Sequence, residues 1–355
     1  MRVGFVCPYS LTLPGGVQGQ VLGLARAMRA AGHEVRVLAP CDGPPPDAGV
    51  TPLGNSIPLA ANGSVAPIAP DIPCVLRTIR AMRDEEFDIV HLHEPLVPGP
   101  CMTVALLKNT PLVGTFHAAG VSASYRWASG PLTWLANRLD IACAVSEDAR
   151  RLAEHYLGGD YEMVFNGIEV ERFAKATPTP TDGPTIFFLG RHEERKGLAV
   201  LLDAMASLPA STRLWVASDG PQTAELMART ASDGRVEWLG RIDDAEKAQR
   251  LRGADVFCAP SLHGESFGVV LLEAMAAATP IVATNIPGYA RVARDGKEAL
   301  LVPPGDAAAL GAALQRVLGE GDLADELSAA GAERADELSM DRLAQVYLDL
   351  YRRLL

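Results

Sequence analysis

The sequence predicts an α/β protein with two doubly wound domains of similar size that face a cleft. Short β-rich runs alternate with longer helical patterns, which is typical of parallel βαβ units. Most of these runs are apolar without interruption, as expected of strands covered by helices on both faces. The alternation stops once, at the Pro- and Thr-rich stretch 175–184, and then starts again, which indicates a linker between two domains.

The predicted strands fall into two groups, one in each Rossmann-like domain. The first domain, residues 1–174, has a helix at 17–31 and strands at 3–7, 34–38, 89–92, 112–116, 141–145 and 163–165. The second domain, residues 185–339, has strands at 186–189, 214–217, 236–239, 256–259, 281–283 and 299–302.

Residues 340–355 form a predicted C-terminal helix. Its apolar stripe consists of Leu343, Val346, Tyr347, Leu350, Tyr351 and Leu354. We expect this helix to cross back and pack on the first domain, although the stripe does not by itself identify a partner.

Composition limits the class of protein. The 355 residues carry a net charge of -11, which argues against nucleic acid as a partner. The six cysteines are scattered without a C-x-x-C spacing, so we expect free, buried thiols in a reducing cytosol. The longest apolar stretch, 269–284, is interrupted by Glu273 and Pro280 and falls short of the roughly 20 residues of a membrane span. Because Met1 runs straight into a strand, we expect no secretory signal and a soluble or peripheral protein.

Open α/β sheets bind ligands beyond the carboxyl ends of their strands, and three loops stand at such ends. The first is Pro14-Gly15-Gly16-Val17, after the first strand. Its two glycines let backbone N–H groups approach a phosphate, and the following helix dipole favours negative charge. An ordinary βα turn would have the same composition, and the dinucleotide motif G-x-G-x-x-G is absent.

The second loop, Gly190-Arg191-His192-Glu193-Glu194-Arg195-Lys196-Gly197, follows the first strand of the second domain. Three cations crowd this strand–helix junction, and Arg191 with Lys196 could clamp a diphosphate. The alternative is a solvated loop in which Glu193 and Glu194 are the partners of these cations.

The third loop runs from His263 to Ala274 and contains two glutamates, Glu265 and Glu273, eight residues apart. With a helix from about Phe267, the glutamates suit the two polar ends of an elongated ligand. The backbone N–H groups of Phe267, Gly268, Val269 and Val270 are then available to a phosphate between those ends. The separation exceeds the roughly 5 Å of a retaining glycosidase pair. Alternatively, Glu273 pairs with a core arginine and Glu265 only favours the helix N-terminus.

Other polar motifs favour structural roles. His91 and His93 share one face of a strand without an evident third ligand, so we interpret them as buried, hydrogen-bonded histidines and expect no metal site. Ser146 and the pair Asp243-Asp244 precede helical patterns, which favours capping, although the aspartates also suit a metal. His117 ends a strand in T-F-H, a suitable position for a site residue.

Together, these motifs resemble the retaining glycosyltransferases of family 4, which have the two-domain GT-B fold. The resemblance runs through nearly the whole chain and rests on P-G-G-V-Q, H-E-P, T-F-H, F-N-G-I, G-R-H-E-E-R-K-G and E-S-F-G-V-V-L-L-E-A-M-A. Within the family, M-R-V-G-F-V-C-P-Y-S, N-G-S-V and C-A-P-S-L-H-G-E-S-F-G are most similar to the phosphatidylinositol mannosyltransferases that use GDP-mannose.

The resemblance implies roles for the matching residues. The donor diphosphate would contact Gly15 and Gly16 from the first domain and would be neutralised by Arg191 and Lys196. The transferred hexose would contact Glu265 and lie beside His117, and the nucleotide side would contact Glu273 and Lys247. The acceptor side would comprise Tyr9, Gln18, Asn62 and Ser64. The implied enzyme needs no cofactor or metal, and acts in the cytoplasm at the inner face of the cell membrane.

Three departures from the family pattern bear on this assignment. Pro67 stands where an arginine suited to the lipid phosphate is usual, and Ala118 stands where a threonine usually follows T-F-H. In Ala217-Ser218-Asp219-Gly220, the first glycine of the usual turn is missing. The first two departures leave open another donor, such as a UDP-sugar, or a soluble acceptor. A sugar-nucleotide epimerase of the same fold and a sugar-binding lectin also remain as alternatives.

A lipid acceptor requires membrane contact. Arg77, Arg80 and Arg83 recur at every third residue and could form a basic helix face. The segment 125–127 (Tyr-Arg-Trp), with Trp134 and Arg138, suits an anionic membrane interface. Solvated helices with a few core aromatics are the alternative, because Asp84 and two glutamates follow Arg83 immediately.

Overall fold

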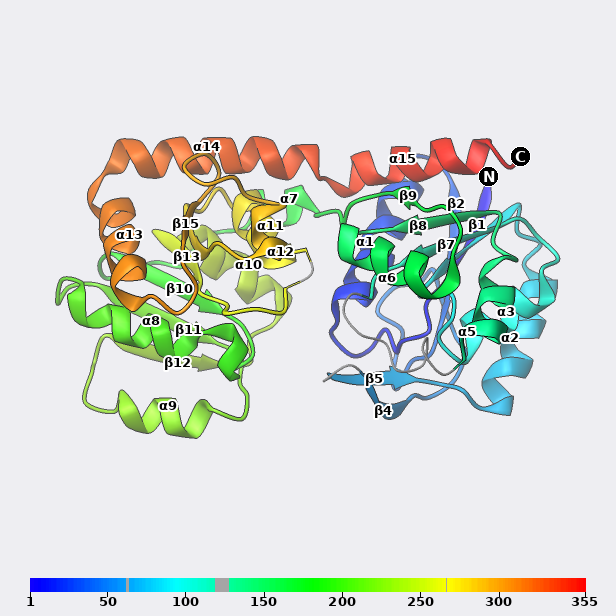
Figure 1. Cartoon of the computed structure of the whole chain (residues 1–355), viewed down its shortest axis with the longest axis horizontal. Helices are drawn as coiled ribbons and strands as arrows, with labels where there is room; N and C mark the ends of the chain where they lie inside the picture. The colour runs from blue at the N-terminus through cyan, green and yellow to red at the C-terminus, as the bar shows by residue number, and fades with distance from the viewer. Residues whose placement is uncertain (62–63, 119–127, 266) are drawn as a thin grey trace. The chain divides into compact units, whose positions relative to one another are not determined.

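The computed structural model describes residues 1–61, 64–118, 128–265 and 267–355, with only the backbone of residues 60, 61, 64 and 65 (Figure 1). The chain divides into two compact units. Unit 1 consists of Met1–Gly167 and Met340–Leu355, and unit 2 of Ile168–Ser339. Unit 2 therefore includes the segment 168–184, in which the linker was predicted.

Unit 1 contains a parallel seven-stranded sheet in the order β3-β2-β1-β6-β7-β8-β9 within the described residues. Its strands are β1 (Arg2–Val6), β2 (Glu34–Ala39), β3 (Val50–Pro52), β6 (Ile89–His93), β7 (Leu112–Phe116), β8 (Ile141–Ala144) and β9 (Glu162–Met163). The strand order reverses between β1 and β6, which is where such sheets bind ligands. The strand expected at 163–165 is instead the two-residue edge strand β9, of which both residues are exposed.

A β-hairpin that we did not predict lies outside this sheet. It pairs β4 (Ile57–Ala61) with β5 (Ser64–Ile68) in antiparallel register. Proline and small residues hide its strand pattern in the sequence. Tyr9 forms an isolated antiparallel bridge with Ile68, so the turn after β1 is joined to the hairpin.

Helices cover the sheet of unit 1 on both faces. They are α1 (Gly16–Ala30), α2 (Ile72–Asp84), α3 (Pro100–Leu107), α5 (Ser129–Ala136), α6 (Glu147–Leu157) and α15 (Met340–Arg352). Asp71 caps α2 by accepting from the Cys74 N–H, and Ser146 caps α6 by accepting from the Ala149 N–H. The capping role predicted for Ser146 is confirmed.

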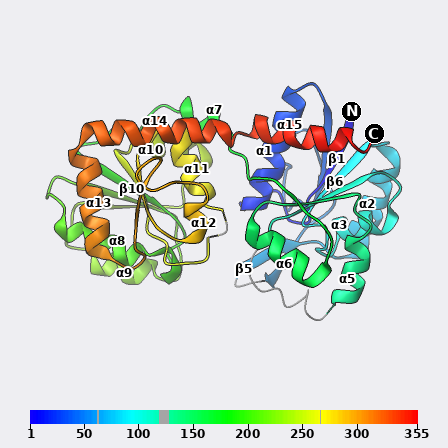
Figure 2. The ribbon, with the colours of Figure 1, turned by 45° about the horizontal axis from the view of Figure 1, so that its top comes forward.

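The C-terminal helix α15 packs beside α1 in unit 1, as Figures 1 and 2 show. The close approach depends on Gly23 of α1, because a Cβ there would lie 2.7 Å from the Met340 side chain. Tyr347 and Tyr351 are fully buried in the same core cluster as β1 and β2. The expected return of this helix to the first domain is confirmed.

Unit 2 contains a second parallel sheet, in the order β12-β11-β10-β13-β14-β15. Its strands are β10 (Thr185–Leu189), β11 (Arg213–Ala217), β12 (Val236–Gly240), β13 (Val256–Ala259), β14 (Ile281–Thr284) and β15 (Leu300–Val302). Here the order reverses between β10 and β13. Both sheets are doubly wound, as predicted.

The helices of unit 2 flank this sheet. They are α7 (Val170–Ala174), η1 (Glu194–Lys196), α8 (Leu198–Ala204), η2 (Met205–Ser207), α9 (Thr223–Arg229), α10 (Asp244–Gly253), α11 (Val269–Ala276), α12 (Pro287–Ala290), α13 (Ala307–Gly319) and α14 (Gly321–Glu337). Asp243 caps α10 by accepting from the Glu246 N–H, as the capping interpretation predicted. The helix expected from Phe267 begins two residues later, at Val269, because Gly268 adopts a left-handed φ of 73°.

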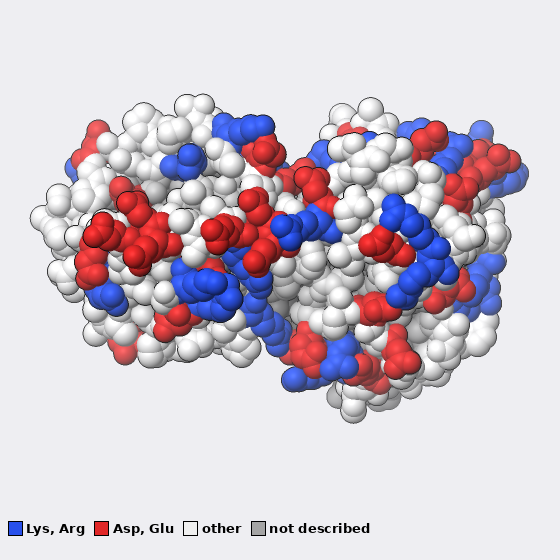
Figure 3. Space-filling view, turned by 90° about the horizontal axis from the view of Figure 1, so that it is seen from above, with Lys and Arg blue, Asp and Glu red and all other residues white. Residues whose placement is uncertain are grey.

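The surface charges, the cysteines and the helix lengths can be compared with what the composition predicted. In each unit, acidic and basic side chains lie interspersed on the surface that Figure 3 shows, rather than in a single basic field. All six cysteines are free and buried. Within the described ranges, no helix is both long and apolar enough to cross a membrane.

Candidate active site

The site in unit 2 lies at the carboxyl ends of β10 and β13, the two adjacent strands at which the sheet order reverses. The loop after β10 contains η1, and the loop after β13 leads into α11. The backbone joins the two loops, because the Leu262 N–H donates to the Arg195 carbonyl over 2.7 Å. Gly197, at a φ of 69°, packs against the Pro260 carbonyl, where a Cβ would overlap the oxygen. The arrangement fixes the position of η1 relative to the glutamate loop.

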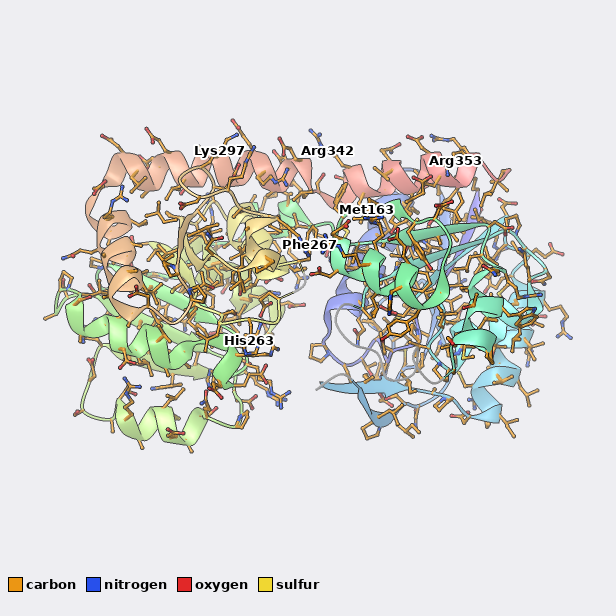
Figure 4. The ribbon with its side chains drawn as sticks, in the orientation of Figure 1. Met163, His263, Phe267, Lys297, Arg342 and Arg353 are labelled. Atoms are coloured by element: carbon orange, nitrogen blue, oxygen red, sulfur yellow. The ribbon has the colours of Figure 1, made fainter. Side chains whose placement is uncertain are left out.

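Glu265 is the centre of this arrangement. Its Oε1 atom accepts from Lys196 Nζ at 2.5 Å, from Arg195 at 3.2 Å and from Ser261 Oγ at 3.3 Å. The Glu265 side chain is only 13% exposed, so the two cations offset the cost of a largely buried carboxylate. In Figure 4 the labels of His263 and Phe267 locate the part of the loop that contains Glu265. Ser266 lies outside the described residues.

Glu273 forms a separate ion pair. Its Oε1 atom accepts from Lys247 Nζ at 2.5 Å, and Lys247 also lies 3.2 Å from Asp244. Burial lowers the pKa of Lys247, but Glu273 and Asp244 outweigh it and raise the pKa above its usual value. Glu273 therefore pairs with a lysine from α10, not with the core arginine considered as an alternative.

The structure brings together Glu265 with Lys196 and Glu273 with Lys247, but it does not bring Arg191 to either pair. Arg191 is exposed, and its guanidinium lies 3.7 Å from Glu193. Between the two glutamates, α11 begins with Val269 and Val270, whose N–H groups have no intrahelical acceptor because they belong to the first turn. Phe267 and Gly268 precede that turn.

In unit 1, a buried carboxylate that we did not predict as a site residue supports His117. Glu94 Oε1 accepts from the backbone N–H groups of His117 and Ala118, at 2.7 and 2.5 Å. Glu94 has a φ of 53° and is almost completely buried. Burial raises the pKa of Glu94 to about 7, although the two N–H donors act in the opposite direction. Its place in H-E-P was the only sequence signal.

Three histidines stack beside Glu94. The ring centroids of His91 and His93 lie 4.3 Å apart, and those of His93 and His117 lie 5.3 Å apart. His93 Nδ1 lies 3.1 Å from His117 Nε2, whereas His91 bonds to Tyr351 of α15 and to Thr115. Burial lowers the pKa of His91 to about 3 and of His117 to about 4, so these rings are neutral. His91 has the buried, hydrogen-bonded role that the sequence favoured.

The glycine loop and the predicted acceptor residues also lie in unit 1. Gly15 precedes α1 in extended conformation, and a Cβ on Gly16 would meet open space. Gln18 is buried, and its amide lies 3.4 Å from the Ser10 carbonyl. Tyr9 is joined to β5, the strand that begins at Ser64. The Ser64 side chain and all of Asn62 lie outside the described residues.

No cluster of three or more potential metal ligands occurs among the residues that the structure describes. The charged groups of the site in unit 2 are carboxylates matched by ammonium and guanidinium groups. A doubly wound sheet with a charged site at its switch point is typical of α/β proteins that bind a ligand there.

Comparisons with known proteins identify the family. A model described as "Glycosyltransferase Family 4" matches residues 14–172, and one described as "Glycosyl transferases group 1" matches residues 183–320. The chain belongs to glycosyltransferase family 4 and is a glycosyltransferase.

Among curated relatives, the chain is similar to the phosphatidyl-myo-inositol mannosyltransferases. It is 40% identical to the protein of that name from Mycobacterium leprae, over 99% of this chain and 96% of the relative. It is 41% identical to that of Mycobacterium tuberculosis H37Rv, over 93% of this chain and 91% of the relative.

Solved structures confirm the GT-B fold. The HepE protein of Anabaena, in complex with UDP and glucose, matches with a TM-score of 0.75 at 18% identity, covering 99% of this chain and 100% of that one. Sucrose-phosphate synthase from Thermosynechococcus elongatus matches with a TM-score of 0.74 at 22% identity, covering 99% and 98%.

Proposed function

We propose that this enzyme transfers mannose from GDP-mannose to the inositol of phosphatidylinositol at a membrane surface, with retention of configuration. The observation that carries the proposal is the pair of lysine-bound glutamates, Glu265 with Lys196 and Glu273 with Lys247, at the switch point of unit 2. The names of the relatives similar over nearly the whole chain support mannose and phosphatidylinositol as substrates.

In the proposed complex, Glu265 accepts hydrogen bonds from hexose hydroxyls and Glu273 from ribose hydroxyls. Lys196 and Arg191 neutralise the diphosphate, helped by the N-terminus of α11 and by Gly15 and Gly16. The bond between the sugar C1 and the phosphate oxygen breaks, and a bond from C1 to an inositol oxygen forms on the same face. The departing phosphate takes the proton of the inositol hydroxyl, so no protein nucleophile is required.

On the acceptor side, His117 lies beside the hexose in this proposal. Glu94 fixes the backbone of His117 and Ala118 through N–H groups that any residue at position 118 would supply. The change from the usual threonine to Ala118 therefore leaves this support intact. Pro67 contributes its carbonyl to the Ser10 N–H, which is again a backbone contact.

An exposed apolar surface of unit 1 supports action at a cytoplasmic membrane face. Helix α3 contacts both α2 and α5. These three helices expose Ile72 and Leu76, which are 75% and 60% exposed, together with Leu106 and Trp134, both 55% exposed. We infer that these exposed apolar side chains contribute to a membrane interface.

The basic residues of this surface are partly neutralised. Arg80 and Arg83 both pair with Asp84, and the Arg77 guanidinium donates to the Leu53 carbonyl. Arg138 lies 5.1 Å from the Trp134 ring centroid and donates to the Ala105 and Leu106 carbonyls. The apolar contact consequently contributes more to the proposed membrane binding than the charge does.

The alternative within the family is another nucleotide sugar or a soluble acceptor, favoured by Pro67 and Ala118. The test uses purified enzyme, GDP-mannose labelled in the sugar, and vesicles with or without phosphatidylinositol, with UDP-glucose in parallel. Label in the lipid phase only with GDP-mannose and phosphatidylinositol is the expected result. Label on water-soluble acceptors without vesicles would contradict the lipid acceptor. Release of free sugar in place of transfer would instead indicate an epimerase.

A lectin-like function is tested by reversing the charge at Lys196. Lys196→Glu should abolish transfer and donor binding, because the diphosphate then meets a carboxylate. A protein that only binds sugar would keep its affinity for mannose in this variant.

A further inference from the structure

A chain of hydrogen bonds that begins in α12 ends on Glu265. The Tyr289 hydroxyl lies 2.9 Å from Ser261 Oγ, and Ser261 Oγ donates to Glu265 Oε1 over 3.3 Å. A serine hydroxyl has a single hydrogen, so a serine that donates to the carboxylate must accept from the tyrosine. The chain therefore runs from Tyr289 through Ser261 to Glu265, and each donor strengthens the next bond.

Burial holds both donors in place. Tyr289 is 1% exposed and Ser261 is 2% exposed, and Thr284 Oγ1 donates to the Ser261 carbonyl over 2.5 Å. Burial raises the pKa of Tyr289, and the nearby Glu265 charge raises it further, so the phenol keeps its proton. A change of rotamer at either residue would leave a buried hydroxyl unpaired, which is unfavourable.

The backbone of α12 packs against the same loop. A Cβ on Gly288 would overlap the Glu265 carbonyl oxygen, and a Cβ on Gly268 would lie 2.9 Å from the Tyr289 ring. Only glycine allows this approach at positions 268 and 288. The Glu265 loop is therefore in direct contact with α12 through both backbone and side chain.

This support selects one orientation of the carboxylate. Arg195, Lys196 and Ser261 all donate to Oε1, whereas no group in the described part of the chain donates to Oε2. Lysine and arginine are long and flexible, so they match the charge of Glu265 without fixing its direction. Ser261 is short and buried, so it fixes the direction in which Oε2 is presented.

We propose that Tyr289 and Ser261 are positioning residues that orient Glu265 toward the hexose of the donor and thereby set the affinity for the sugar relative to the nucleotide. This inference rests on the proposed function, in which Glu265 binds the hexose. The Tyr289 hydroxyl acts through Ser261, and the Ser261 hydroxyl acts through Glu265.

The test compares Kd values for GDP and for GDP-mannose, measured by calorimetry, in Tyr289→Phe and Ser261→Ala. Each variant should weaken GDP-mannose binding about tenfold and change GDP binding by less than about twofold. The double variant should be no weaker than Ser261→Ala alone, because that substitution already breaks the chain. The matched control is Thr279→Val. It removes a buried hydroxyl that donates to the Leu251 carbonyl near the amino ends of β13 and β14, opposite the carboxyl ends that form the site, so the ratio of the two Kd values should not change.

A general structural role would weaken both ligands equally, and that result would overturn the inference. An unchanged ratio of the two Kd values in Tyr289→Phe and Ser261→Ala would also overturn it, provided that Glu265→Gln weakens the binding of GDP-mannose but not that of GDP. If Glu265→Gln binds both ligands as the unaltered enzyme does, the hexose role of Glu265 fails, and with it the proposed function on which the inference rests. Tyr289→Phe keeps the shape of the side chain, so folding is expected to survive and the comparison remains possible.

Discussion

Lys247 Nζ lies 2.5 Å from Glu273 Oε1, so a carboxylate on α11 is matched by an ammonium group from α10. Lys196 and Glu265 repeat the relationship at the same distance in the neighbouring loops. In both pairs, the lysine occupies one carboxylate oxygen, and the described residues offer no donor to the other. The proposed donor would therefore find one free carboxylate oxygen at each end.

The two glutamates should separate nucleotide binding from sugar binding. Glu273→Gln removes the charge but keeps the side-chain shape, and we expect it to weaken GDP and GDP-mannose alike, by about tenfold, since ribose is common to both. Glu265→Gln should weaken only GDP-mannose. Calorimetric titration of both variants with both ligands checks this. Equal effects of the two substitutions on GDP would contradict the assignment of opposite ends.

Substitution of Lys196 should lower the affinity for the diphosphate and the salt dependence of that affinity. Lys196→Met removes one of the cations on Glu265 but leaves Arg195 in place at 3.2 Å, so the loop keeps a counter-ion. We expect GDP affinity to fall by about 10- to 100-fold, as for a lost charge-assisted hydrogen bond, while GMP affinity changes much less. Titrations at two ionic strengths should also show a weaker salt dependence. A parallel loss for GMP would place Lys196 elsewhere on the nucleotide.

The turn after β11 should be stabilised by glycine. Ser218 has a φ of 89°, a conformation that favours glycine, and it stands where the family's first glycine is usual. Ser218→Gly should raise the free energy of unfolding by about 1 kcal/mol. The control Ser218→Ala keeps the Cβ and should give no gain. Urea unfolding of both variants checks this, and an equal gain in both would show that the backbone is not the cause.

Local sequence patterns predicted the sheets well but not every site residue. Strands covered on both faces are apolar runs, so β6, β7 and β13 could be found without a structure. The loops at their carboxyl ends followed from the topology. Glu94 could not be found in this way, because its partners are backbone N–H groups more than twenty positions away.

The start of α11 depends on a similarly non-local contact. Nothing in the apolar pattern distinguishes Phe267 from Val269 as the first helical residue. The left-handed Gly268, packed against Tyr289 of a later helix, moves the start to Val269. Ser261 and Tyr289 were missed for the same reason, since their hydroxyls meet only in the folded chain.

The apolar surface of α2 should be needed for vesicle binding but not for folding. Ile72→Ser with Leu76→Ser removes two well-exposed apolar side chains, so it should weaken binding to phosphatidylinositol vesicles at least about tenfold. Vesicle sedimentation measures this, and GDP affinity should not change. The control Met227→Ser removes an exposed apolar side chain from α9 of unit 2. Unchanged vesicle binding in the α2 variant, or an equal loss in the control, would contradict the proposed membrane surface.

Acid should destabilise unit 1 through its stacked histidines. Burial lowers the pKa values of His91, His93 and His117 below the usual 6.5, to about 3 for His91 and about 4 for His117. As the pH falls from about 6.5 toward 4, the unfolded chain takes up three protons that the folded chain does not, so stability is lost. Glu94 acts in the opposite direction, because its pKa of about 7 lets the folded chain hold one extra proton between about 4.5 and 7.

Between about pH 6.5 and 4.5, where both effects operate, the net difference is about two protons, which corresponds to a loss of up to about 2.7 kcal/mol for each pH unit. Hydrogen exchange of peptides from β6 and β7, corrected for the intrinsic pH dependence of exchange, should show this slope. His91→Asn should flatten it by about one proton, since it removes one of the three stacked imidazoles. His155→Asn, which replaces an exposed histidine of the same unit, should leave it unchanged. If both substitutions change the pH dependence of stability equally, the stacked histidines are not the cause of the loss of stability in acid.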